Sequence, residues 1–367
     1  MTAAQPIDIS SADLQTLPTM RHEIAVYCPF PLRSHPFDTW AIDGQAVQWC
    51  LDHRLVAQRM GCADGIAAAL PHAPESTIIA ATKWFYWGAL VDDFWDDHPD
   101  LKQMVAHVGA LQRVMYTGSD APLRPGDEWA ASLRDLRREL ETVLTAAEMV
   151  WFRGEVAAWL EGQLWYTALQ HGATPDLGTY LGMRWAKCGA ATLVAFTAAT
   201  MGCELPISEL DDPPVRAFIE AVMWACTIIN DVGSAAKERD AGTAKTNLIT
   251  VLAAAHGLDT AAALIKAWQL YERIVSVAWH LQQQLRADPR PAVARLAADL
   301  PAWIPAGIHW AATTSRYREF TGTSTAGTAP KVTLSQTPIL WDRDNLTPPP
   351  HPEIAWWWQE LAEKGSR

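Results

Sequence analysis

Between about residue 40 and residue 320 the sequence consists of long runs of apolar residues with helical spacing, separated by short Pro, Gly and Asp segments. No stretch alternates apolar and polar residues convincingly, as a half-buried strand would. With 367 residues, of which 49% are hydrophobic, the chain is long enough to bury a sizeable core. No internal repeat of fixed period is present. We therefore predict an all-α chain.

The clearest helical runs have recognisable ends. A cap signal near Ser76 begins the run that leads into WFYWGALVDDFWDD, and His98-Pro99 ends it. A second long run, RAFIEAVMWACTIINDVGSAAKERDA, stops at Gly242, as expected for a C-terminal glycine. The apolar segment 188–201 is too short to span a membrane, and a buried helix suits it better. Other predicted helices are AWLEGQLWYTALQ, TAAALIKAWQLYERIVSVAWHLQQQLRA and PAGIHWAATTSRYREF.

The two ends of the chain differ from the middle. We expect residues 1–24 to be disordered, and the prolines of YCPFPLRSHPFD predict an extended strap. After Phe320 the sequence TGTSTAGTAPKVTLSQTP is small, polar and loop-like, and EIAWWWQELAEK predicts one last amphipathic helix. This pattern predicts a main domain at 25–322 and a tail at 323–367. The tail is either a flap packed on the main domain or a mobile appendage, and its three consecutive tryptophans favour the flap.

The composition limits the classes of partner. A formal net charge of -12 argues against nucleic acid, because phosphate backbones need a basic face. The six cysteines form no CxxC pair and no Cys/His cluster with zinc spacing, so we interpret them as reduced thiols. The N-terminus has no apolar signal-peptide core, and no run predicts a membrane span, which favours a cytoplasmic protein. The nineteen tryptophans fit core packing, or an aromatic-lined cavity whose ring faces attract cations.

Four carboxylates, those of DDFWDD, directly follow one of the most apolar stretches of the chain. On one helix, Asp92 and Asp96 would lie one turn apart on one face, with Asp93 and Asp97 on the next. Acids at a helix C-terminus are unfavourable by about 0.3–1 kcal/mol each, whereas a divalent cation would reverse this balance. The motif therefore predicts a metal site or an acidic, hydrated helix end. An EF-hand is disfavoured, because Asp97 and Gln103 stand where its loop needs Gly and Glu.

A second group of oxygen donors lies in IINDVGSAAKERDAG. Asn230, Ser234 and Glu238 are spaced four residues apart, so they drift by only about 40° per step around a helix. An amide oxygen, a hydroxyl and a carboxylate therefore share one stripe and could together bind a further Mg²⁺. Lys237 stands beside them and is placed to bind an anion bridged by the metals. The alternative is an ordinary polar helix face.

Together, DDFWDD and the later NDVGSAAKE resemble the two metal-binding motifs of the bacterial class I terpene synthase family. Other segments follow in that family's order. YCPFPLRSHP resembles its Pro-rich strap, NLITVL resembles the segment after its second motif, and TTSRYREF carries its paired Arg and Tyr. Arg184 stands where the family keeps a diphosphate-sensing arginine. The resemblance covers about residues 25–322 and leaves the tail unexplained.

The resemblance implies a single bundle of α-helices around a central apolar cavity, with both motifs at its mouth. It also implies three Mg²⁺ ions that clamp the diphosphate of an isoprenoid substrate. Asp92 is expected to bridge two ions, assisted by Asp96 or Asp97, which the sequence does not rank. The implied metal ligands are Asp92, Asp93, Asp96, Asp97, Asn230, Ser234 and Glu238. The groups implied to bind or sense the diphosphate are Arg184, Lys237, Arg316 and Tyr317.

The same resemblance implies a shaped pocket for a carbocation, walled by aromatic faces and free of nucleophiles. Phe85 lies two helical turns before Asp92 on the same face, and Ala89 would leave room between them. The remaining expected cavity residues are Trp84, Gly189 and Trp310. Plain core packing is the alternative for each aromatic residue.

One segment departs from the family pattern. Shortly after its sensor arginine, the family usually has a small acidic or polar linker and a glycine-like effector where the helix breaks. Here the segment is RWAKCGA, in which Lys187 and Cys188 occupy those places and Gly189 follows one position later. Either the helix break has shifted by one residue, or ionisation is triggered differently.

The implied activity is Mg²⁺-dependent ionisation of an acyclic prenyl diphosphate, cyclisation to a terpene hydrocarbon or alcohol, and release of diphosphate. Farnesyl diphosphate is the first choice of substrate, and geranylgeranyl diphosphate or a bicyclic C20 diphosphate is the alternative. A chain-elongating prenyltransferase would need a second aspartate-rich motif, where this chain has NDVGSAAKE. A non-catalytic prenyl-binding helical protein would leave Arg184, Lys237 and Arg316-Tyr317 unexplained. We expect a monomer or a homodimer.

Overall fold

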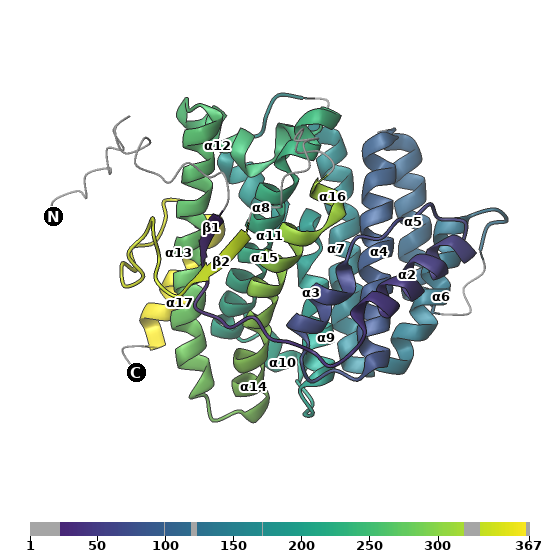
Figure 1. Ribbon diagram of the computed structural model, residues 1–367, viewed down its shortest axis with the longest axis horizontal. Coiled ribbons are helices and arrows are strands. Elements are labelled where there is room, and N and C mark those ends of the chain that lie inside the picture. Colours follow the sequence, from purple (N-terminus) through teal and green to yellow (C-terminus); the bar gives the residue numbers. More distant parts are fainter. Residues whose placement is uncertain (1–22, 99, 119–122, 171, 319–330, 365–367) are drawn as a thin grey trace.

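A computed structural model describes residues 23–98, 100–118, 123–170, 172–318 and 331–364 (Figure 1). Within these ranges the regular elements are helices, apart from two short strands. In chain order they are β1 (Glu23–Tyr27), α2 (Thr39–Asp52), α3 (Cys62–Ala69), α4 (Glu75–Asp97), α5 (Leu101–Thr117), α6 (Glu128–Val143), α7 (Ala146–Gln170), α8 (Leu177–Cys188), η1 (Ala190–Thr192), α9 (Leu193–Thr200), α10 (Ile207–Leu210), α11 (Pro213–Ala241), η2 (Ala244–Thr246), α12 (Leu248–His256), α13 (Thr260–Arg286), α14 (Pro291–Asp299), η3 (Leu300–Ala302), α15 (Trp303–Thr313), α16 (Ser315–Arg318), β2 (Lys331–Ser335) and α17 (Pro352–Lys364).

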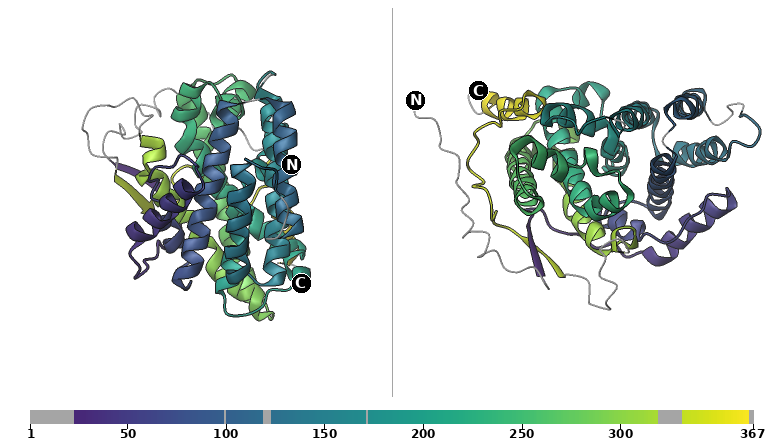
Figure 2. Two further views of the ribbon diagram at one scale, coloured as in Figure 1. Left: turned by 90° about the vertical axis from the view of Figure 1, so that its right-hand side faces the viewer. Right: turned by 90° about the horizontal axis from the view of Figure 1, so that it is seen from above.

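The longest helices run side by side and appear nearly end-on from above (Figure 2). Helix α11 packs against α13, α15 and α17, while α7 packs against α5, α8 and α9. Helix α4 packs against α2, α3 and α6. The prediction of an all-α bundle is therefore confirmed.

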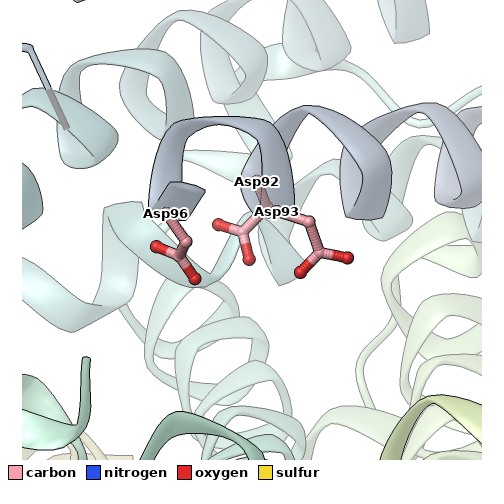
Figure 3. A group of neighbouring side chains, drawn as sticks. All are labelled: Asp92, Asp93 and Asp96. Atoms are coloured by element: carbon pink, nitrogen blue, oxygen red, sulfur yellow. The ribbon is translucent and has the colours of Figure 1, made fainter. Parts of the chain in front are cut away.

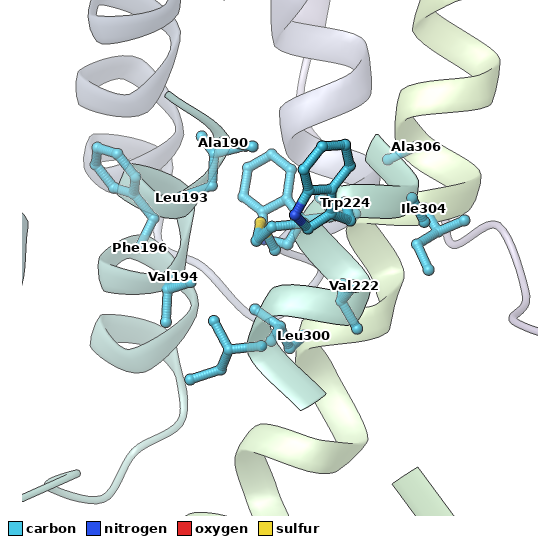
Figure 4. Close-up of a cluster of buried hydrophobic side chains, with 14 of the residues drawn as sticks. Ala190, Leu193, Val194, Phe196, Val222, Trp224, Leu300, Ile304 and Ala306 are labelled. Carbon is cyan, nitrogen blue, oxygen red and sulfur yellow. The ribbon is translucent and has the colours of Figure 1, made fainter. Parts of the chain in front are cut away.

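Part of the core lies between α9, α11 and α15. Trp224 of α11 is 2% exposed and stands among aliphatic and aromatic side chains from these helices (Figure 4). Phe196 of α9 and Ile304 of α15 are fully buried in the same cluster. Because buried side chains pack at nearly crystalline density, this cluster holds the three helices at fixed spacing beneath the site described below.

The ends of the two motif-bearing helices agree with the sequence, except for one cap. Helix α4 reaches Asp97 and stops at His98, and α11 stops at Gly242, which adopts a left-handed conformation with φ of 76°. The expected cap at Ser76 is wrong. Helix α4 starts after Pro74, whose φ of -66° suits a helix start, and no side chain caps it.

Two predicted helices are each divided. The run PAGIHWAATTSRYREF forms α15 and then the short α16, because Thr314 leaves the helix with ψ of 139°. Its hydroxyl donates to the carbonyl of Met60 at 2.8 Å and accepts from the backbone N–H of Arg316 at 3.2 Å. The buried segment 188–201 is also not one helix, since Gly189 ends α8 and η1 intervenes before α9.

The two strands lie outside the bundle and correct two predictions. β1 and β2 pair in parallel, with Glu23 opposite Lys331 and Tyr27 opposite Ser335. Glu23 and Ile24, which the sequence placed in the disordered N-terminal segment, therefore belong to β1, and the expected disorder of residues 1–22 lies outside the described residues. Residues 331–335 are a strand and not a loop, because pairing with β1 supplies the backbone partners that sequence alone does not show. Residues 28–38 carry no regular structure, as the proline-rich sequence predicts.

The tail packs along the side of the bundle, beside α13 (Figures 1 and 2). The buried carboxylate of Glu272 on α13 accepts the backbone N–H groups of residues 339–341 at 2.6–3.0 Å. Helix α17 packs on α11 and α13, and its Trp357 is fully buried and donates to Glu220 at 3.0 Å. The tail residues that the structure describes are thus attached to the main body.

No single described helix is long and apolar enough to cross a membrane. Helices α12 and α13 pass that test together on length and composition alone, although they are bent by 110°.

Replacing Trp357 by Ala should lower the free energy of unfolding by about 3–5 kcal/mol, because it empties a buried site and leaves Glu220 without its indole donor. Urea unfolding followed by circular dichroism measures this. The matched variant Trp165→Ala removes an indole that is 49% exposed, and it should change stability by about 0.5 kcal/mol or less. Equal losses in the two variants would contradict the docking of α17.

Candidate active site

A pocket with a cavity volume of ≈ 200 Å³ lies among α3, α4, α7, α8, α11 and α15, with α16 at its edge. Aromatic, aliphatic and small side chains line its interior. The charged lining residues come from the C-terminal halves of α4, α8 and α11 and from α16. The cavity therefore has an apolar depth and a polar mouth.

Three of the four motif carboxylates gather at this mouth. Asp92, Asp93 and Asp96 leave the same side of α4 and can each place one oxygen within 4.8 Å of the others (Figure 3). Asp97 is exposed and is not in this group. Of the two positions that the sequence left unranked, Asp96 is thus the one beside Asp92. The reason is geometric, since Asp97 points about 100° further around the helix than Asp96.

The second oxygen stripe faces the same pocket. Asn230, Ser234 and Glu238 all line it from α11, as their helical spacing predicted. The Ser234 hydroxyl donates to Glu238 Oε1 at 2.6 Å. Asn230 Nδ2 donates to the Tyr317 hydroxyl at 2.7 Å, which connects α11 to α16. Asp92 and Asn230, which lie far apart in the sequence, therefore face one shared cavity.

Cations from three elements pair with the α4 carboxylates. Lys187 of α8 forms an ion pair with Asp92, and Lys237 of α11 forms one with Asp93. Arg316 of α16 also pairs with Asp93, with its Nη2 donating to Oδ1 at 2.9 Å, and its Nη2 lies 3.7 Å from Asp92 Oδ2. Two of these cations were expected from the sequence as diphosphate ligands. Lys187 was noted there only as a departure from the family pattern.

Arg184 is buried one layer behind the mouth. Its Nε donates to Asp231 Oδ1 at 2.8 Å, and its Nη2 donates to Asn230 Oδ1 at 2.7 Å. Tyr180 also donates to Asp231. Burial lowers the pKa of Arg184, but the Asp231 carboxylate outweighs it and keeps the pKa well above its usual value. Arg184 is therefore a fixed charge that positions Asn230 through its amide oxygen.

Asp231 and Asn247 are two functional candidates that the sequence did not reveal. Asp231 is 1% exposed and accepts the backbone N–H of Leu248 at 3.0 Å. Asn247 Nδ2 donates to Glu238 Oε2 at 3.0 Å and to the Asp231 carbonyl at 2.8 Å, while its Oδ1 caps α12. The available signal was NLITVL, which begins with Asn247 and follows the second motif.

Burial and charge shift the titration of the clustered acids in opposite directions. Burial raises the pKa of Asp92, but Lys187 and Arg316 lower it to about 2. Burial and the nearby Asp92 charge raise the pKa of Asp96 to about 7. Burial and Asp231 raise the pKa of Glu238. Asp92 is therefore ionised at neutral pH. For Asp96 and Glu238, a further positive charge nearby would stabilise the ionised form of the carboxyl group.

The three predicted aromatic residues all line the apolar part of the pocket, but they differ in how deeply they are buried and in what they contact. Phe85 is half-buried, and its ring meets Trp310 edge-on with centroids 5.0 Å apart. Trp84 is buried, donates to the Thr192 hydroxyl at 3.0 Å and contacts Trp159. Phe85 and Trp310 are thus shaped as cavity walls, while Trp84 combines a lining position with core packing. Ala89 and Gly189 also line the pocket.

The helix break after the sensor position lies at Gly189. This residue ends α8 with φ of 68°, a left-handed conformation that favours glycine. A Cβ atom at this position would also approach the Trp159 ring at 2.9 Å. Of the two alternatives left by the sequence, a break shifted by one residue agrees with this geometry, and it leaves Lys187 and Cys188 inside α8.

The donors at the mouth fit a hard divalent cation. The acidic group of α4 consists of carboxylates only, and the facing stripe of α11 supplies an amide, a hydroxyl and a carboxylate. Magnesium and calcium prefer such oxygen ligands, whereas zinc and copper favour nitrogen and sulfur. Burial raises the pKa of Asp96 and of Glu238, so a divalent cation beside them would stabilise their ionised forms.

The family described as terpene synthase family 2, C-terminal metal binding, matches residues 83–276, which contain both motifs. The chain belongs to the bacterial class I terpene synthase family. It is therefore a terpene synthase with a divalent-metal site. The prenyltransferase and the non-catalytic alternatives are set aside, and the predicted fold class is confirmed.

Similar proteins match nearly the whole chain. Bonnadiene synthase of Allokutzneria albata is 28% identical over 355 residues, which cover 91% of this chain and 96% of that protein. The (+)-T-muurolol synthase of Streptomyces clavuligerus, named as (2E,6E)-farnesyl diphosphate cyclizing, is 25% identical over 94% of this chain and 84% of its own length. A solved structure of a mutant of the SVS_A2 protein, from ancestral sequence reconstruction, is 26% identical with a TM-score of 0.77 over 92% of this terpene synthase and 98% of that chain.

Replacing Asn247 by Ser should weaken divalent-metal binding by about tenfold or more, because Ser keeps the helix cap but cannot reach Glu238. Binding of Mn²⁺, followed by the loss of its free electron paramagnetic resonance signal, measures the affinity. The control Asp259→Ser exchanges the cap of α13 outside the pocket and should leave the affinity unchanged. Unaltered affinity in a folded Asn247→Ser protein would show that metal binding does not depend on the hydrogen bond from Asn247 to Glu238.

Proposed function

We propose that this terpene synthase ionises an acyclic prenyl diphosphate with the help of Mg²⁺, cyclises the resulting carbocation and releases inorganic diphosphate. One observation carries this proposal. Two oxygen-bearing helix faces, at Asp92–Asp96 and Asn230–Glu238, meet with Lys237 and Arg316 at the mouth of one cavity whose depth is apolar. Such a site separates the charged leaving group from the hydrocarbon chain.

We assign the metal role to Mg²⁺ and expect three ions. The proposed ligands are the three clustered carboxylates of α4, together with Asn230, Ser234 and Glu238 of α11. Bound Mg²⁺ would stabilise the negative charge that develops on the departing diphosphate. Asp97 is exposed, and we expect it to serve at most through its charge.

The side chains proposed to bind the diphosphate are Arg184, Lys237, Arg316 and Tyr317. Lys237 and Arg316 both pair with Asp93 in the structure, so they must exchange this partner for phosphate oxygens when substrate arrives. The planar guanidinium of Arg316 suits such an exchange, because it can donate two parallel hydrogen bonds. Tyr317 is linked to Asn230, which connects diphosphate binding to the second oxygen stripe.

The depth of the pocket suits a carbocation. The rings of Phe85 and Trp310 offer electron-rich faces that stabilise positive charge without reacting with it. The thiols of Cys62 and Cys226 also line the pocket, and burial raises the pKa of both. They therefore stay protonated, which keeps them weakly nucleophilic beside a reactive cation.

Farnesyl diphosphate is the substrate we propose first. Two similar proteins, the T-muurolol synthase and a 4-epi-cubebol synthase of Streptosporangium roseum, are named as cyclizing it. Geranylgeranyl diphosphate is the second candidate, because many lining residues are small and leave depth for a longer chain. These small residues are Gly65, Gly88, Ala89, Gly189, Ala190, Ala306, Gly307 and Ala311. We propose a monomer or a homodimer.

Incubation with geranyl, farnesyl and geranylgeranyl diphosphates and Mg²⁺ tests the function. We expect diphosphate release together with a cyclic hydrocarbon or alcohol, detected by mass spectrometry, and no release after chelation of the metal. Asp92→Ala and Asn230→Ala should each reduce turnover by a factor of about 10³ or more, because each removes a proposed ligand. Helicity by circular dichroism should remain nearly unchanged. Full turnover in either variant, or no product from any of the three substrates, would refute the proposal.

Replacing Phe85 by Ala should change the distribution of products more than the rate of diphosphate release, since it removes a cavity wall and no proposed ligand. Gas chromatography with mass spectrometry measures the distribution. The matched variant Phe94→Ala lies on the same helix and packs against His98 and Trp129, away from the pocket lining. It should keep the native products. An unaltered profile in Phe85→Ala would assign Phe85 to the core.

A further inference from the structure

The mouth of the pocket is almost neutral without any added ion. Among the residues that the structure describes at the mouth and in the buried layer directly behind it, four basic side chains face five acidic ones. The basic residues are Arg184, Lys187, Lys237 and Arg316, and the acidic residues are Asp92, Asp93, Asp96, Asp231 and Glu238. A divalent ion that bound alone would therefore add charge to a site that is already balanced, and it would have to compete with ion pairs in place.

Of the three cations that pair with the α4 carboxylates, Lys187 has the most buried side chain. It is 6% exposed, pairs with Asp92 and lies with its Nζ 4.3 Å from the centre of the Tyr166 ring. An ammonium group held between a carboxylate and an aromatic face is stabilised from both sides. Lys237 and Arg316 also pair with carboxylates, but they are 17% and 11% exposed at the side chain.

The backbone below Lys187 is held tightly as well. A Cβ atom on Gly162 of α7 would lie 2.6 Å from the backbone nitrogen of Lys187, so the two helices meet there without room for any side chain. Gln163 donates to the Lys187 carbonyl at 3.5 Å. The following Gly189 ends the helix. The base of the side chain is therefore fixed, and only its end can exchange one anion for another.

We propose that Lys187 is a built-in counterion of Asp92 that makes metal binding depend on diphosphate. Without substrate, Lys187 holds Asp92 and competes with the divalent ion for it. When metal and diphosphate enter together, Asp92 turns to the metal and the Lys187 ammonium turns to a phosphate oxygen. No bond is made or broken in this exchange. The proposal rests on the proposed function and adds to it the order in which the site fills.

The test compares Mn²⁺ binding with and without inorganic diphosphate by equilibrium dialysis, in which Mn²⁺ bound to diphosphate alone is present equally on both sides of the membrane. No turnover is required. For the wild type we expect weak binding of Mn²⁺ alone and much tighter binding with diphosphate. Lys187→Met keeps an unbranched side chain of nearly the same length but removes the ammonium group that pairs with Asp92 and meets the Tyr166 ring. It should bind Mn²⁺ alone about tenfold more tightly, which corresponds to the loss of about 1.4 kcal/mol of competing ion pairing. The gain from adding diphosphate should shrink by at least the same factor.

Two further variants keep the outcome interpretable. Lys83→Met removes a cation of the same kind, which pairs with Glu139 at 2.5 Å away from the pocket, and it should bind Mn²⁺ as the wild type does. Lys187→Arg keeps the charge and should keep the dependence on diphosphate. Lys187→Gln, which is also uncharged, replaces the methionine variant if that protein fails to fold by circular dichroism.

The inference is overturned if Lys187→Met binds Mn²⁺ alone no more tightly than the wild type, or if Lys187→Arg behaves as an uncharged variant. A wild type that binds no Mn²⁺ even with diphosphate would instead refute the proposed function. The two failures are therefore distinguishable.

Discussion

The carboxylates at the end of α4 lie close together because cations from three other elements neutralise them. Lys187 of α8, Lys237 of α11 and Arg316 of α16 each contribute a positive charge to this cluster. Several like charges within a few ångströms of one another in a partly buried site would otherwise repel strongly. These ion pairs also join α4, α8, α11 and α16 around one opening. The arrangement of the mouth therefore depends on charge balance as much as on apolar packing.

Helix α11 performs two tasks with neighbouring residues. Asn230 and Glu238 face the pocket, whereas Asp231, one position further around the helix, accepts hydrogen bonds from α8 and from the start of α12. Arg184 and Asn247 then connect this buried carboxylate layer back to the pocket-facing residues. The orientation of the proposed ligands is thus set by groups behind them, as is usual for metal sites in proteins.

The same helices supply the apolar depth through their earlier turns. Phe85 lies two turns before Asp92 on α4, and Cys226 lies one turn before Asn230 on α11, and all four residues line the cavity. A hydrocarbon chain and a diphosphate therefore find separate environments along one pair of helices. Burial acts on both halves, because it raises the pKa of the Cys226 thiol in the depth and partly shields the ion pairs at the mouth from water.

Sequence alone determined the helices, their stripes and the family, because these depend on spacing along one chain. It predicted the end of α4 before Pro99, the stop of α11 at Gly242 and the shared face of Asn230, Ser234 and Glu238. Contacts between distant segments were decided only by the tertiary structure. These include the pairing of β1 with β2, the hydrogen bond from Asn247 to Glu238 and the ion pair between Lys187 and Asp92. The physical reason is that a helical period places a side chain on a face, whereas its partner there is set by how the helices pack.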